Sequence, residues 1–66
     1  MPDPRRVAAV AHILNVSYGL ASEVSSCEAD IEYDMEITRR ALQALGVTVD
    51  ELDAGEKAMF SAPWDF

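Results

Sequence analysis

The chain has 66 residues with a formal net charge of −7 and a single cysteine. A chain of this length forms one small domain of marginal stability, and one cysteine excludes an internal disulfide. The negative charge disfavours binding to nucleic acid or to an anionic membrane and favours a basic protein surface as partner. We therefore expect a cytoplasmic protein that gains stability from a second copy of itself or from a larger complex.

The first predicted helix begins at Pro4 with Asp3 as its N-cap and extends to Ser22 or Val24. Its apolar side chains cover more than half of the helix circumference, which one short neighbour cannot bury. This excess again favours self-association or a partner. The apolar residues are Val7, Val10, Ala11, Ile13, Leu14, Tyr18, Leu20, Ala21 and Val24.

Two alternatives accompany this helix. Gly19 lowers helix propensity, so a break after Val16 is the alternative to one continuous helix. The apolar run 7–21 is interrupted by His12, Asn15 and Ser17, and we expect it to be too short to cross a bilayer. The same polar interruptions disfavour a secretory signal.

Residues 27–37 alternate a small or apolar residue with an acid, and they form the only strong electrostatic feature of the chain. Alternation is typical of a half-buried strand, but acids are rare in strands and we find no convincing second strand to pair with. On a helix the segment instead begins an apolar stripe at offsets of three and four residues, so we favour a helix. The stripe comprises Ile31, Met35, Thr38, Leu42 and Leu45, and the acids are Glu28, Asp30, Glu32, Asp34 and Glu36.

Local signals predict where the second and third helices begin and end. The segment 25–28 resembles a capping box that opens the second helix, and Gly46 is expected in a left-handed conformation after Leu45. Thr48 and Glu51 form a second capping box. It opens a short helix from Val49 to Phe60, in which Gly55 lowers the helix propensity. Val47 and Leu52 are placed as the hydrophobic staple of this helix, and Leu52, Met59 and Phe60 as its apolar contacts.

The chain is thus predicted to be an all-α, three-helix domain over residues 1–60, followed by a C-terminal aromatic tail over residues 61–66. Pro63 cannot continue the third helix. Trp64 and Phe66 on this tail either fold back onto the small core or serve as apolar anchors in a partner, since tryptophan is enriched at binding hot spots.

No residue pattern in the sequence predicts an enzyme, a cofactor or a metal site. The single histidine, His12, lacks the acid three positions earlier that a di-iron motif requires, and it is expected near the polar edge of the first helix, between its apolar and polar faces. No nucleophile has a base and an orienting group nearby in a recognisable arrangement. Cys27 is expected to be a small buried or half-buried residue.

Two segments, 11–17 and 39–52, resemble parts of helix-turn-helix proteins of the phage-repressor (Cro/XRE) type. The first is similar to the helix and turn of that family, and the second to its closing helices. The resemblance implies a transcriptional regulator. However, the segment at the place of the recognition helix, residues 17–25, contains Glu23 and no lysine or arginine, so DNA binding would have been lost or reside in a partner.

We conclude from the sequence that the chain is a non-catalytic acidic module that docks on a basic partner protein and modulates it. Inhibition of nucleic-acid-handling machinery is one way in which such a module acts. The expected partner-binding residues are Glu28, Asp30, Glu32, Asp34, Glu36, Trp64 and Phe66. The alternatives are a degenerate helix-turn-helix regulator and a small accessory or structural subunit of a larger complex.

Overall fold

The computed structural model describes residues 2–61 and consists of three helices in this range. They are α1 (Pro4–Val24), α2 (Glu28–Ala44) and α3 (Val49–Ser61), and the described residues contain no strand. The predicted all-α, three-helix fold is therefore confirmed. The acidic alternation lies on a helix, and the strand alternative for residues 27–37 is wrong.

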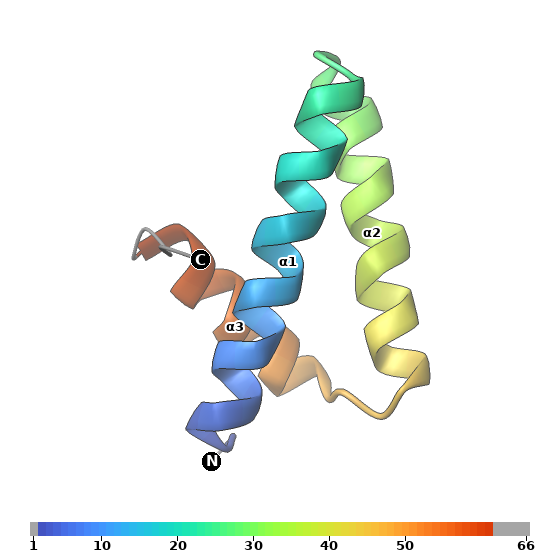
Figure 1. Ribbon diagram of the computed structural model, residues 1–66. Helices are drawn as coiled ribbons and strands as arrows, with labels where there is room; N and C mark the ends of the chain where they lie inside the picture. Colours follow the sequence, from blue (N-terminus) through green and yellow to red (C-terminus); the bar gives the residue numbers. More distant parts are fainter. Residues whose placement is uncertain (1, 62–66) are drawn as a thin grey trace.

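The helices α1 and α2 stand side by side as an antiparallel hairpin, and α3 crosses the N-terminal half of α1 (Figure 1). The third helix packs mainly on α1 and touches α2 much less. Since α3 has 13 residues and α1 has 21, it covers only part of the hairpin. The upper part of the hairpin and its whole opposite face remain uncovered by α3.

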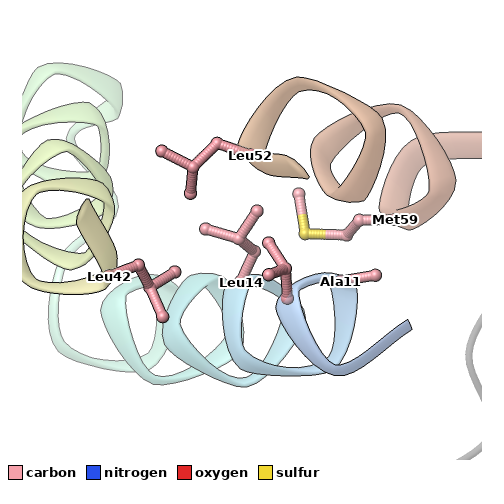
Figure 2. Packing of buried hydrophobic residues seen from close by; sticks show 6 residues of the cluster. Ala11, Leu14, Leu42, Leu52 and Met59 are labelled. Atoms are coloured by element: carbon pink, nitrogen blue, oxygen red, sulfur yellow. The ribbon is translucent and has the colours of Figure 1, made fainter. Parts of the chain in front are cut away.

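The core lies where the three helices meet (Figure 2). Leu14 of α1 and Leu52 of α3 are its largest fully buried side chains, and Leu42 is the buried contribution of α2. Met35, Val47 and Ala58 are half-buried and pack against this cluster. The buried residues of the cluster are Val10, Ala11, Leu14, Leu42, Leu52 and Met59.

Gly55 allows α1 and α3 to approach closely. A Cβ atom placed on Gly55 would lie 2.5 Å from Cγ1 of Val10 and 3.3 Å from the backbone nitrogen of Ala11. The sequence indicated only the propensity cost of this glycine. The close contact between α1 and α3 compensates for this cost, because any larger residue at position 55 would push the two helices apart.

The first helix begins as predicted and continues without a break. The Asp3 side chain accepts a hydrogen bond of 2.9 Å from the backbone N–H of Arg5, and α1 runs through Gly19 to Val24. The alternative of a break after Val16 is wrong. The resemblance of residues 11–17 to a helix and turn is not borne out either, because these residues form continuous helix.

The prediction that the apolar run is too short to cross a bilayer is wrong on length, because the helix extends beyond the run on both sides. By length and composition alone, α1 could cross a membrane: it has 21 residues, and its most apolar window has a mean hydropathy of 1.3. Core helices of soluble proteins and N-terminal signal sequences share these properties. The helix α1 supplies four buried residues, three of them to the central cluster.

The start of α2 differs from the predicted capping box. Cys27, which is exposed, is the N-cap and its side chain makes no capping hydrogen bond. The Ser25 hydroxyl instead accepts a hydrogen bond of 3.1 Å from the backbone N–H of Cys27, outside the helix. The helix ends at Ala44, and Gly46 adopts the predicted left-handed conformation with φ of 99°.

The start of α3 confirms the second capping box. The Glu51 carboxylate accepts a hydrogen bond of 2.9 Å from the backbone N–H of Thr48, and the Thr48 hydroxyl accepts one of 3.2 Å from the backbone N–H of Glu51. Glu51 also pairs with Arg6 at the start of α1, through Nη2 at 3.1 Å and through Nε. This side chain therefore ties the start of α3 to the start of α1.

Three predicted burials are wrong. Leu45 is 82% exposed and Phe60 is 71% exposed, and Cys27 is exposed as well. Leu45 is the C-cap that follows the last residue of α2, and Phe60 lies in the last turn of α3. The apolar stripe of α1 is only partly buried, because α3 covers one side of it.

Candidate binding groove

The acidic run divides between two sides of α2. Because each residue advances the helix by about 100°, Glu28, Glu32 and Glu36 lie on one side, whereas Asp30 and Asp34 lie on the other. All five side chains are exposed, as the sequence predicted. They do not form one continuous acidic surface, however, and the two groups have different neighbours.

The three glutamates border a groove of about 470 Å³ between the helices. The groove lies where α3 leaves the upper part of the hairpin uncovered. Its floor is apolar and comes from all three helices, with Leu14 from α1, Met35 from α2 and Met59 from α3. The remaining lining residues are Tyr18, Glu28, Ile31, Glu32, Glu36, Arg39, Glu56 and Phe60.

Two aromatic side chains stand at the edge of the floor. Tyr18 is 44% exposed and Phe60 is 71% exposed, so both offer apolar surface to a ligand. Neither was among the partner-binding residues expected from the sequence. Their role depends on where α3 crosses the hairpin, and no local pattern in the sequence carries this information.

The rim of the groove is negative even after its one cation is counted. Arg39 donates to Glu56 and lies 3.5 Å from Asp53, so its charge is shared by two carboxylates of α3. Glu36 pairs with Arg40 on its own helix at 3.4 Å, a contact typical of residues four apart on a helix. Within residues 2–61, no hydrogen bond or ion pair engages the carboxylates of Glu28 and Glu32.

Glu51 is the acid whose environment is most perturbed, and it lies outside the groove. The side-chain hydrogen bond from Arg6, followed by the backbone hydrogen bond from Thr48, lowers the pKa of Glu51 from 4.5 to about 2. The same pair raises the pKa of Arg6. Because Arg6 and Thr48 both donate to this carboxylate, Glu51 joins the start of α3 to the start of α1 and serves the fold.

Other candidate residues do not gather into a site. Among residues 2–61, no three histidine, cysteine, aspartate or glutamate side chains are placed to hold a metal ion. Asp30 accepts a hydrogen bond of 3.3 Å from the Ser25 hydroxyl, next to the loop that joins α1 and α2. The two expected tail anchors, Trp64 and Phe66, lie outside the described residues.

Comparison with known proteins identifies no relative. No family model, curated protein or solved structure matches the chain.

Proposed function

We propose that the chain is a non-catalytic, acidic binding module that docks on a partner protein and modulates it. The observation that carries the proposal is the groove with an apolar floor and a rim of carboxylates. Such a surface fits a segment that is apolar on one side and basic on the other. The proposed ligand is an amphipathic helix of the partner with lysine or arginine along its edges.

The apolar floor would supply most of the affinity. Ile31 and Met35 are half-buried and Tyr18 and Phe60 are exposed, so a ligand side chain placed there removes apolar surface from water on both partners. Two methionines line the groove, Met35 and Met59. Flexible methionine side chains adapt to ligands of different shape.

The rim would supply selectivity and speed of association. Glu28 and Glu32 are exposed and unengaged within the described residues, so a cation can approach them without breaking an existing ion pair. Complementary charge of this kind raises the association rate and excludes acidic partners more than it raises affinity. Asp30 and Asp34 lie on the other side of α2 and are not proposed to touch the same ligand.

Trp64 and Phe66 are proposed as additional apolar anchors. They follow α3, whose last turn carries Phe60 at the edge of the groove. Their place in the sequence, directly after α3, supports a role in contacts to a ligand bound in the groove. The exposed apolar residues of the hairpin further support a domain that is dimeric or stabilised by a partner.

The test is calorimetric titration with a synthetic amphipathic helix of leucine and lysine, and with the same helix carrying glutamate in place of lysine. The Glu28→Gln/Glu32→Gln variant should bind the lysine peptide about 3–10 times more weakly, as expected for the loss of two exposed charge contacts. Raising the salt concentration should weaken binding to the wild-type chain. The glutamate peptide should not bind.

The matched control is Asp30→Asn/Asp34→Asn, which removes the same amount of charge from the same helix on its other side. It should bind the lysine peptide as the wild-type chain does. Equal losses in the two variants would indicate attraction to net charge without use of the groove, and the proposal would be wrong. A duplex DNA fragment serves as the further probe, and binding to it would favour the regulator alternative.

A further inference from the structure

The face of the hairpin opposite the groove is apolar, and no described part of the chain covers it. We call it the open face. It has one row of side chains from α1 and one from α2, spaced by three or four residues so that each row follows one side of its helix. The rows are Ala9, Ile13, Val16 and Leu20 on α1 and Ile37, Ala41 and Leu45 on α2.

Contacts between the helices place both rows on the same side. The hydroxyls of Ser17 and Thr38 meet at 2.7 Å in the seam between α1 and α2, and both rows lie on the same side of this seam by helix geometry. Ile13 and Leu45 also line one shared hollow at the lower end of the hairpin. The groove and α3 lie on the other side of the seam.

The open face exposes more large apolar side chains than a small soluble domain needs. Ile13, Val16 and Ile37 are between 42% and 49% exposed, and Leu20 and Leu45 are 59% and 82% exposed. Continuous apolar surface of this kind marks an interaction site.

The charges at the two ends of the open face point to a second copy of the same chain. Arg5 continues the α1 row at the lower end, and its side chain makes no hydrogen bond or ion pair within the described residues. Asp30 and Asp34 continue the α2 row at the upper end. The face is therefore positive at one end, apolar in the middle and negative at the other end.

A surface with this pattern is complementary to itself after a rotation of 180°. We propose that two copies of the chain pack through their open faces. They are related by a two-fold axis that lies in the interface between the copies, near Val16 and Ile37. The rotation brings Arg5 of each copy toward Asp30 and Asp34 of its partner. Each contact occurs twice, which is the rule for a two-fold interface.

The arrangement leaves both grooves accessible. Because the groove and the open face lie on opposite sides of the hairpin, the dimer presents two grooves that face away from each other. The inference deepens the proposed self-association, but it does not depend on what the groove binds.

Sedimentation equilibrium of the full chain tests the proposal, with circular dichroism as the check of folding for each variant. The wild-type chain should dimerise. Leu20→Gln should raise the dimer Kd at least about 10-fold, because the symmetric interface loses two apolar side chains. The control Phe60→Gln removes an exposed apolar residue of α3 on the groove side of the hairpin, and it should leave the dimer Kd unchanged.

Charge reversal tests the antiparallel arrangement. Arg5→Glu and Asp34→Lys should each raise the dimer Kd by about 2- to 10-fold, and the double variant Arg5→Glu/Asp34→Lys should return it toward the wild-type value. If the losses of dimerisation free energy in the two single variants simply add in the double variant, the two-fold arrangement would be overturned. A wild-type chain that stays monomeric, or that binds phosphatidylcholine vesicles as a monomer, would overturn the dimer itself.

Discussion

Replacing Gly55 with alanine tests the closest contact in the fold. The new Cβ atom would lie 2.5 Å from Cγ1 and 3.0 Å from Cβ of Val10, well inside van der Waals contact. Val10 is 3% exposed, and its branched side chain has one favoured rotamer in a helix, so it cannot turn aside. The same Cβ atom would lie 3.3 Å from the backbone nitrogen of Ala11, so α3 has no room to move closer to α1 at this point.

Two effects of opposite sign decide the outcome. Alanine is better than glycine in a helix by up to ~1 kcal/mol. Overpacking a tight core costs about 1–3 kcal/mol. We therefore expect Gly55→Ala to lower the free energy of unfolding by about 1–2 kcal/mol, which in a domain of this size lowers Tm by about 4–8 °C per kcal/mol.

Gly19→Ala is the matched control. Gly19 lies within α1, and a Cβ atom placed there would meet nothing within 4 Å. Only the propensity effect remains, so this variant should gain about 0.5–1 kcal/mol. Urea unfolding of both variants, followed by circular dichroism at one fixed protein concentration, measures the difference.

A Gly55→Ala variant as stable as Gly19→Ala would refute the close approach of α1 and α3. Val10→Ala gives an internal check, because it removes the Cγ1 atom that the new methyl group meets. Gly55→Ala should therefore cost less in the Val10→Ala background than in the wild-type chain. Equal costs would mean that another contact causes the loss.

Three further predictions follow from the described contacts. Glu51 has a pKa of about 2 in the folded chain against an ordinary value of 4.5, so its stabilising effect is complete above about pH 4.5 and is lost as the pH falls toward 2. Unfolding measured over a series of acidic pH values should show this loss of stability, and the loss should be smaller in Glu51→Gln. Thr48→Ala removes the capping hydrogen bond to Glu51 and should cost about 1 kcal/mol in urea unfolding. Leu52→Ala should cost about 2–5 kcal/mol because Leu52 is 1% exposed, whereas Val24→Ala, at a position 83% exposed, should change stability by less than about 0.5 kcal/mol.

The sequence predicts the helices well because local chemistry sets their ends. Asp3 with Pro4, Gly46, and the pair Thr48 and Glu51 act within a few residues of one another, and the structure confirms each of them. The capping box at Ser25 failed for an equally local reason. The Ser25 hydroxyl bonds to Cys27 in the loop, and the helix begins two residues later than that box requires.

Burial and the site were harder to predict, because they depend on where α3 crosses the hairpin. Helical periodicity grouped Leu45 with Leu42, but Leu42 is 5% exposed whereas Leu45 is 82% exposed. The pairing of Arg6 with Glu51 joins positions 45 residues apart, and no local pattern indicates it. An Arg near the start of one helix and a capping-box acid on another give only a weak signal of such a pair.

The acidic run shows the same limit. Its residues were correctly expected to be exposed, but a helix separates Glu28, Glu32 and Glu36 from Asp30 and Asp34. The acids form one segment in the sequence, but they lie on two surfaces of α2 that have different neighbours. One surface borders the groove, and the other ends the open face.

The most direct test of the groove as a binding site is a nuclear magnetic resonance titration of the isotope-labelled chain with the leucine–lysine helix. We predict that the backbone amide signals of Tyr18, Glu32 and Met35 shift on binding and that those of Ile37 and Leu45 do not. Shifts centred on Ile37 and Leu45, or spread evenly over all three helices, would contradict the assignment of the groove.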